Sequence, residues 1–251
     1  MSAHPLSQHH AAPDELAGRV IAITGASDGI GRAVAQAASA SGAQVILLGR
    51  NLRKLTATYD AISAAQGDVS TRVQLDYETA VAADYDRIAA AVMDRYGRLD
   101  GLVHCAAQLG SLTPIELYDV PMWCRLLHVN VTAAFALTQV LMPALRASKD
   151  ASVLFTSSSV GRQGRAYWGA YAVSKFALEG LSQVLADETL GNSAIRVNTI
   201  NPGKARTLMR RQAYPSEDLA SLPEPATLTG LYLALLGPAG AGITGQSLDC
   251  Q

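Results

Sequence analysis

Three side chains in the segment 156–175, which reads TSSSVGRQGRAYWGAYAVSK, can together move a proton to or from a carbonyl oxygen. Tyr171 and Lys175 are four positions apart in a stretch with helical spacing of apolar residues, so we expect them on one helix face. A free phenol has a pKa of about 10, and a cation beside it favours the phenolate. Ser158 follows the apolar run 153–155, the expected end of a strand, where its hydroxyl can hold a substrate oxygen beside the tyrosine.

A tyrosine and a lysine at this spacing also occur by chance, so an ordinary, partly buried helix face is the alternative interpretation. The rest of the chain favours the catalytic one, because short apolar runs alternate with longer amphipathic stretches. The expected strands are 19–24, 44–48, 73–75, 101–104, 151–155, 196–200 and 246–249. The expected helices are a stretch ending near 41, one beginning near 52, and 80–96, 119–147, 169–190 and 226–236. This order predicts an α/β fold: a Rossmann-like, doubly wound parallel sheet of about seven strands, with three αβα layers in one domain.

The turn from Thr24 to Gly31 joins the first strand to the first helix, where the pyrophosphate of a dinucleotide sits over a helix N-terminus. Its glycines are spaced GxxxGxG, which permits a tight turn and a close approach of phosphate to backbone. A glycine-rich turn alone is weak support, but its position at the head of a βαβ series predicts dinucleotide binding. The predicted cofactor residues in the turn are Gly25, Ser27, Asp28, Gly29, Ile30 and Gly31.

The end of the second strand, Leu48-Gly49-Arg50-Asn51, carries no carboxylate. In NAD-binding sheets an acidic residue about 20 positions after the turn binds the ribose 2′-hydroxyl. Arg50 instead offers a planar cation suited to a 2′-phosphate, which favours NADP(H) over NAD(H). The alternative, a solvated surface arginine, is less consistent with this position. Asp28 would slightly oppose the extra phosphate.

Composition excludes several classes of protein. Of the 251 residues, 49% are hydrophobic and 16% charged, as in a well-packed globular protein, and the net charge of −1 argues against nucleic acid or an anionic membrane as the main partner. The three cysteines are widely spaced, which argues against a disulfide framework or a zinc site and for a reducing compartment. With no uninterrupted apolar run near the roughly 18 residues of a membrane span, and no signal pattern, we expect a cytoplasmic protein.

Two segments stand outside the alternating pattern. Residues 1–16 are polar, with two prolines and three histidines, and are predicted to be a flexible tail rather than a metal site, which leaves 17–251 as the cofactor-binding domain. Residues 207–225 are rich in arginine, proline and polar side chains. Because ligands bind beyond the carboxyl ends of the strands in such sheets, this segment is predicted to be a substrate lid.

With these features in place, the chain resembles the classical short-chain dehydrogenase/reductase family from about Gly18 to Asp249. TGASDGIG at 24–31 is similar to the cofactor turn of that family, and YAVSK at 171–175 is similar to its Tyr-x-x-x-Lys motif. Ser158 lies thirteen positions before Tyr171, which is the family's spacing.

The resemblance implies roles for further residues. Asn130, in HVNVTAAF, matches a fourth catalytic residue, whose side chain helps to hold a water that links the lysine to solvent. Lys175 is implied to bind the nicotinamide ribose as well, and Asp76 to touch the adenine. Asn201-Pro202-Gly203 followed by Thr207 looks like the family's motif at the nicotinamide end. The cofactor contacts implied outside the glycine turn are Arg50, Asp76, Ala106, Tyr171, Lys175, Pro202, Gly203 and Thr207.

The chain departs from the family pattern after the fourth strand. Where the family commonly has Asn-Asn-Ala-Gly, residues 104–107 read HCAA, so a hydrogen bond from the usual asparagine is lost. We interpret Cys105 as a small buried residue rather than a reactive thiol. We interpret His104 as structural rather than as a catalytic base.

These features predict hydride transfer between NADP(H) and a carbonyl or alcohol, such as a ketone, an aldehyde or a 3-oxoacyl compound. Ser158 and Tyr171 would bind the carbonyl oxygen, and Tyr171 would donate the proton. The arginines near the site, among them Arg162, Arg165 and Arg206, either recognise an acidic or acyl-carrier-linked substrate or have structural roles, and for the first two the structural role is preferred.

The rival from another class is a non-catalytic NADP(H)-binding redox sensor. Such proteins typically lose the tyrosine or the lysine, and both are present here. The resemblance also implies a homodimer or homotetramer paired through the long helices 119–147 and 169–190.

Overall fold

Seven parallel strands form one sheet in the computed structural model, which describes residues 3–67 and 70–251. The strand order is β3-β2-β1-β4-β5-β6-β7, so the chain winds outward in both directions from β1. The strands are β1 (Val20–Thr24), β2 (Gln44–Gly49), β3 (Ser70–Gln74), β4 (Gly101–His104), β5 (Ala151–Thr156), β6 (Ile195–Asn201) and β7 (Ser247–Asp249). This arrangement confirms the predicted Rossmann-like α/β class.

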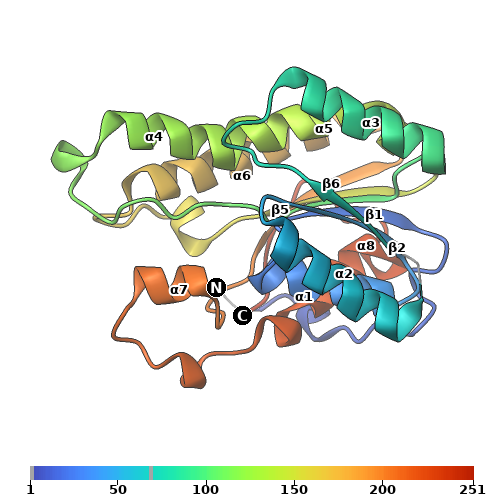
Figure 1. Ribbon diagram of the computed structural model, residues 1–251, viewed down its shortest axis with the longest axis horizontal. Coiled ribbons are helices and arrows are strands. Elements are labelled where there is room, and N and C mark those ends of the chain that lie inside the picture. Colours follow the sequence, from blue (N-terminus) through green and yellow to red (C-terminus); the bar gives the residue numbers. More distant parts are fainter. Residues whose placement is uncertain (1–2, 68–69) are drawn as a thin grey trace.

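Helices cover both faces of the sheet, as Figure 1 shows, with α3 to α6 on one face and α1, α2 and α8 on the other. Their bounds are α1 (Gly29–Ala40), α2 (Leu52–Gln66), α3 (Ala82–Tyr96), α4 (Val120–Leu127), α5 (Ala133–Arg146), α6 (Gly169–Thr189), α7 (Leu208–Ala213) and α8 (Gly230–Leu236). The inner strands are buried along their whole length, which explains their nearly continuous apolar sequences.

The register brings the carboxyl ends of the inner strands to one edge of the sheet. Thr24 at the end of β1 pairs with His104 at the end of β4, and His104 pairs with Phe155 in β5. Thr156 in turn pairs with Ile200 in β6. The glycine turn, the segment after β4 and the serine segment after β5 therefore all begin at this edge, where ligands bind in open α/β sheets.

The long predicted helix 119–147 is interrupted by a π-helical turn, His128–Thr132, between α4 and α5. Single π turns inside helices often occur at functional sites, and this one carries Asn130. The third strand also lies earlier than predicted, at Ser70–Gln74 rather than 73–75.

The N-terminal segment differs from the predicted flexible tail. In the described part, residues 3–16, the backbone N–H of His4 donates to the carbonyl of Asp249 at 2.9 Å. Leu16 is fully buried in the core beneath α1 and α8. A side chain on Gly230 would collide with the Ser7 carbonyl, which shows how closely the segment packs on α8. In the structure, a few apolar residues within this polar stretch anchor the segment to the fold.

One described helix, Val120–Arg146, is long and apolar enough to cross a membrane by length and composition alone, with a mean hydropathy of 1.4. It comprises α4, the π turn and α5. In the fold, α4 packs on α6 and α5 packs on α3 (Figure 1). Core helices of globular proteins pass the same test, so length and composition alone do not make this helix a membrane span.

We predict that Leu16→Ala lowers the free energy of unfolding by about 2–4 kcal/mol, because the substitution leaves a cavity in the core. Leu190→Ala is the matched control, since Leu190 is 66% exposed. Urea unfolding followed by circular dichroism measures both changes. A cost for Leu16→Ala no larger than for the control would show that the N-terminal segment does not pack in solution.

Candidate active site

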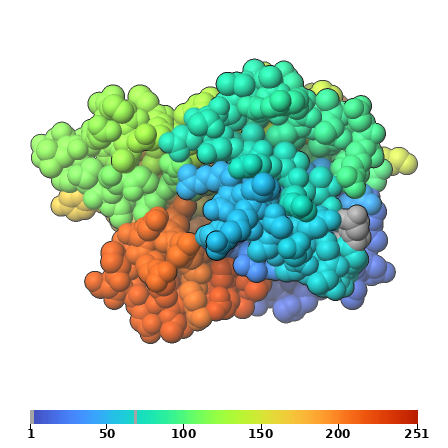
Figure 2. Space-filling view, in the orientation of Figure 1, coloured from blue at the N-terminus to red at the C-terminus, as the bar shows by residue number. Residues whose placement is uncertain are grey.

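A cleft of about 1090 Å³ opens at the carboxyl edge of the sheet. Its walls are the glycine turn, the segment after β4, the ends of β5 and α6, and the segment 201–213 that includes α7. In the space-filling view, the orange α7 segment and the green α4 segment lie next to each other on one side of the molecule (Figure 2). The volume is sufficient for a dinucleotide end and a small substrate.

Ser158, Tyr171 and Lys175 all line this cleft. Ser158 caps a 3-10 turn directly after β5, and Tyr171 lies in the first turn of α6. Burial raises the pKa of Tyr171 to about 12, and a hydrogen bond between its side chain and Ser158 works in the opposite direction. The structure thus brings together the hydroxyl and the phenol that the sequence pairs.

Lys175 is 3% exposed, and its Nζ donates to the carbonyl oxygen of Thr156 at 2.7 Å. Burial lowers the pKa of this lysine to about 8, against the opposing effects of Cys105 and Glu179. Its Nζ lies 5.5 Å from the centroid of the Tyr171 ring. The sequence predicted that the lysine would lower the pKa of the tyrosine. In this structure burial raises the pKa of Tyr171, and the influence that opposes it is the hydrogen bond with Ser158.

Asn130 lies behind the cleft wall and is 1% exposed. Its Oδ1 accepts from the backbone N–H of Gln108 at 2.8 Å, and its Nδ2 donates to the Gln108 carbonyl at 2.9 Å and to Ser174 Oγ at 3.0 Å. The Ser174 hydroxyl donates to the carbonyl of Tyr171 at 2.7 Å. Asn130 therefore ties the segment after β4 to the helix turn that carries the tyrosine.

One turn after the lysine, the buried carboxylate of Glu179 joins α6 to β6, to β7 and to the segment after β5. It accepts hydrogen bonds from the hydroxyls of Ser157 at 2.5 Å, Thr199 at 2.6 Å and Ser247 at 2.7 Å. Arg162 lies against the same carboxylate at 3.4 Å and pairs with Asp249 at 2.7 Å. The preferred structural role of Arg162 agrees with these contacts, and sequence reasoning missed Glu179, one helical turn after Lys175.

The glycine turn forms the backbone cradle that a pyrophosphate requires. Gly25 has a φ of 66°, and a Cβ on it would lie 2.9 Å from the backbone nitrogen of Ala106. A Cβ on Gly31 would lie 2.5 Å from the carbonyl oxygen of Gly25. Thr24 Oγ1 accepts from the Ala106 N–H at 3.1 Å and fixes the neighbouring segment. The residues present therefore fit a dinucleotide.

The predicted cofactor residues are brought together along the cleft. Those that line it are Gly25, Ser27, Asp28, Gly29, Ile30, Gly31, Arg50, Asp76, Ala106, Tyr171, Lys175, Pro202, Gly203 and Thr207. Arg50 is largely exposed, with Glu78 at 3.9 Å. Thr207 Oγ1 accepts from the backbone N–H of Arg210 and caps α7.

Two residues of this region escaped sequence reasoning. Lys54 lines the cleft from the first turn of α2 and donates to Asp28 at 2.6 Å. Asn51 caps α2 by accepting from the backbone N–H of Lys54. Since asparagine is a common helix cap, Asn51 is the sequence signal that could have located Lys54 at this end of the helix. Gln251 donates from Nε2 to the Pro202 carbonyl at 2.8 Å.

The predicted lid segment is braced by its own arginine. Arg206 pairs with Glu224 and donates to the carbonyls of Ala220 and Leu222, so it is structural. Arg165 donates to the hydroxyl of Tyr214 at 2.7 Å and so joins the segment before α6 to segment 207–225.

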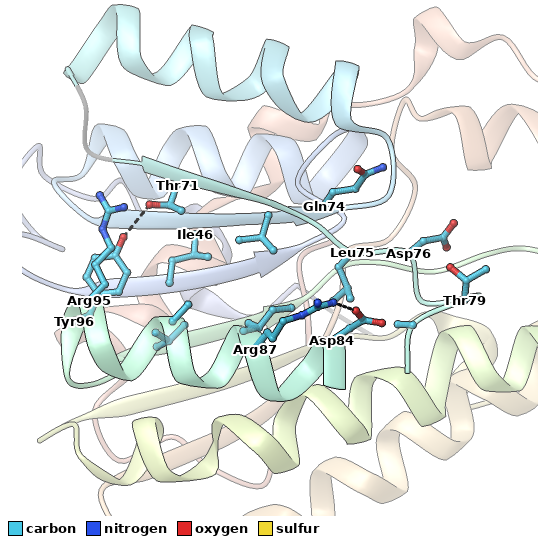
Figure 3. A pocket seen from close by; sticks show the side chains of 15 residues that line it. Ile46, Thr71, Gln74, Leu75, Asp76, Thr79, Asp84, Arg87, Arg95 and Tyr96 are labelled. Carbon is cyan, nitrogen blue, oxygen red and sulfur yellow. Dashed lines mark hydrogen bonds and ion pairs between the residues drawn. The ribbon is translucent and has the colours of Figure 1, made fainter. Parts of the chain in front are cut away.

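A second hollow, of about 500 Å³, lies between β3 and α3. Figure 3 shows its polar pairs, Thr71 with Tyr96 and Asp84 with Arg87. It contains none of the four candidate catalytic residues. The larger cleft is therefore the candidate active site.

The other candidate groups are inert in this fold. Cys105 contacts Thr156 Oγ1 at 3.2 Å, and burial raises the pKa of its thiol to about 11, so it is not a reactive thiolate. His104 is buried, bonds Thr138 Oγ1 at 2.9 Å and stacks on Phe155. Within residues 3–67 and 70–251, no cluster of three metal-binding side chains occurs.

A parallel sheet with a glycine cradle, and with a buried tyrosine and lysine beside a serine at its carboxyl edge, is the architecture of a dinucleotide-dependent oxidoreductase. The family model described as short chain dehydrogenase matches residues 19–218, and the chain belongs to this family.

Similar proteins cover nearly the whole chain. The uncharacterized oxidoreductase YciK of Escherichia coli K12 is 47% identical over 95% of this chain and 94% of its own length. A Pseudomonas syringae protein assigned to the short-chain dehydrogenases is 50% identical, with a TM-score of 0.95 over 97% of this chain and 98% of that one. A Shigella flexneri protein of the same assignment, crystallised with NADP, is 46% identical, with a TM-score of 0.93 over 96% and 100% of the two chains.

His104 gives a test of stability against pH. Burial lowers its pKa to about 3, so between that pH and about 6.5 the unfolded chain binds a proton that the folded chain does not. Stability conferred by the neutral ring is complete above about pH 6.5 and falls as the pH drops. We predict a loss on the order of 2 kcal/mol between about pH 7.5 and pH 5, which His104→Asn removes. Urea unfolding at the two pH values measures it, and equal losses in both proteins would contradict the assignment.

Proposed function

We propose that this chain is an NADP(H)-dependent oxidoreductase that transfers a hydride between its cofactor and a carbonyl or alcohol substrate, such as a ketone, an aldehyde or a 3-oxoacyl compound. The observation that carries the proposal is the buried phenol of Tyr171, hydrogen-bonded to Ser158 in the cleft that contains the glycine cradle. A proton donor and an oxygen-binding hydroxyl thus lie together where a dinucleotide fits.

The choice of NADP(H) rests on the end of β2. Gly49 and Arg50 stand where an NAD-binding sheet presents a carboxylate, and Arg50 lines the cleft. The crystallised relative with NADP supports the same choice. When bound, NADPH supplies the hydride.

The residues of the chain supply the proton and orient the substrate carbonyl. A tyrosine with a pKa near 12 keeps its proton at neutral pH, so Tyr171 is set to donate to the carbonyl oxygen that Ser158 holds. Alcohol oxidation requires the phenolate, and the charged form of Lys175 favours it. Because the pKa of Lys175 is about 8, this lysine exchanges protons readily near neutrality. Asn130 holds the Gln108 segment against α6 and is proposed to complete a proton relay.

The substrate end of the cleft is apolar. Leu109, Val160 and Tyr171 form a buried cluster there, and Trp168 and Met209 pack against it. The ring of Trp168 lies 5.7 Å from the ring of Tyr171. These walls favour a substrate whose carbonyl carries an alkyl chain or a ring, and segment 207–225 is proposed to act as its lid.

We predict that Tyr171→Phe lowers kcat by about 100-fold to 10,000-fold, because the carbonyl oxygen loses its proton donor. NADPH affinity, measured by the change in protein fluorescence, should change little. The assay uses a panel of ketones, aldehydes and 3-oxoacyl thioesters with NADPH and NADH in parallel. Tyr167→Phe is the matched control, because Tyr167 is 60% exposed.

Full activity in Tyr171→Phe would contradict the mechanism. Binding of NADPH by the wild-type protein without turnover of any member of the panel would favour the redox sensor.

We also propose that the chain forms a homodimer or homotetramer through α5 and α6. Phe176 is 45% exposed, and Val173 and Val184 share its helix face. Phe135 on α5 is also 46% exposed. An apolar helix face of this kind is typical of a subunit contact.

The cytoplasm remains the proposed compartment, and its reducing conditions suit the free cysteines.

Phe176→Glu should shift the protein toward the monomer, because a carboxylate would be buried in the contact. Size-exclusion chromatography with light scattering measures the mass. Val81→Glu, at the exposed N-cap position before α3, is the control and should leave the mass unchanged. A monomeric wild-type protein at micromolar concentration would contradict the proposed assembly.

A further inference from the structure

We propose that Lys54 strengthens the preference for NADP(H) by neutralising the carboxylate of Asp28 at the rim of the cofactor cleft. The inference rests on the proposed use of NADP(H) and assigns a role to a residue outside the family's motifs. In this proposal Lys54 acts through Asp28 rather than by contacting the cofactor. Arg50 remains the cation that faces the extra phosphate.

The ion pair is well defined. Lys54 Nζ lies 2.6 Å from Asp28 Oδ2, and the other carboxylate oxygen accepts from the backbone N–H of Gly29 at 2.8 Å. Although partial burial opposes it, the hydrogen bonds from Lys54 and Gly29 hold the pKa of Asp28 below its usual value. Asp28 is therefore an anion at neutral pH, and both side chains line the cofactor cleft.

An anion at this position has a cost that depends on the cofactor. NADP(H) differs from NAD(H) by a phosphate group that carries nearly two negative charges at neutral pH. The 2′-phosphate is expected near Arg50, and Arg50 lines the same cleft as Asp28. An uncompensated Asp28 would repel NADP(H) more strongly than NAD(H). A lysine bonded directly to the carboxylate removes most of that difference.

The position of Asp28 explains why the carboxylate is present at all. Its side chain caps the N-terminus of α1, the same helix end that receives the pyrophosphate. The cap stabilises the glycine turn but places a negative charge beside a polyanionic ligand. Lys54 comes from a different helix, α2, so the pair also connects the turn to the segment after β2.

The test is a double-mutant cycle on cofactor binding, measured by isothermal titration calorimetry without substrate. Lys54→Gln should weaken NADPH binding about fivefold and NADH binding less than twofold, because both side chains are half-exposed and solvent screens the repulsion. The NADPH effect should shrink at high salt. In the double variant Asp28→Asn with Lys54→Gln, NADPH affinity should return to about that of Asp28→Asn alone, since asparagine still caps the helix.

Arg53→Gln is the matched control, because it removes the same charge from the neighbouring, exposed position of α2 and should leave both affinities unchanged. Equal loss of NADPH and NADH affinity in Lys54→Gln would overturn the proposal in favour of a structural role. Weak NADPH binding that persists in the double variant would overturn it in favour of direct contact between Lys54 and the phosphate. A wild-type protein that binds no NADPH would instead contradict the proposed function itself.

Discussion

The buried carboxylate of Glu179 is the interaction on which the geometry of the site depends. It lies one helical turn after Lys175 and accepts hydroxyl hydrogen bonds from the residue after β5, from within β6 and from the start of β7. These bonds fix the rotation of α6 about its axis, because a turn of the helix would leave a buried charge without partners. The faces that carry Tyr171 and Lys175 are thereby directed into the cleft. Apolar packing alone would hold α6 on the sheet but would set its rotation less strictly.

Burial also controls the chemistry. It raises the pKa of Tyr171 and lowers that of Lys175, so both groups are driven toward their neutral forms. A neutral phenol is the form that protonates a carbonyl oxygen. The Thr156 carbonyl accepts a hydrogen bond from Lys175, but as a neutral dipole it offsets only part of the cost of burying the ammonium charge. Under the proposed mechanism, the neutral phenol serves carbonyl reduction, and the charged lysine favours the phenolate that alcohol oxidation needs.

The sequence was sufficient for the fold class, and the cofactor residues that it predicts line one cleft. Parallel strands with intervening helices leave few arrangements, and the Tyr171–Lys175 spacing and the glycine turn each fix a position on that framework. The sequence was insufficient for properties such as a pKa, which depend on the balance between loss of solvation and new contacts. The pKa of Tyr171 depends on how far α6 sinks into the cleft, and the spacing of residues contains no information about depth. Glu179 and Leu16 look like ordinary residues of a helix and a tail until partners distant in sequence surround them.

The two ends of the cleft are stabilised in different ways, and this limits how the protein can change. At the chemical end, Lys175, Asn130 and Glu179 are buried, so replacement of one leaves others unsatisfied at a cost of several kcal/mol. At the cofactor's phosphate end and at the lid, the ion pairs are partly exposed and individually weak. Substitutions there alter binding without unfolding the protein. The buried groups of the cleft therefore tolerate substitution poorly, whereas the exposed charges at its rim can change one at a time.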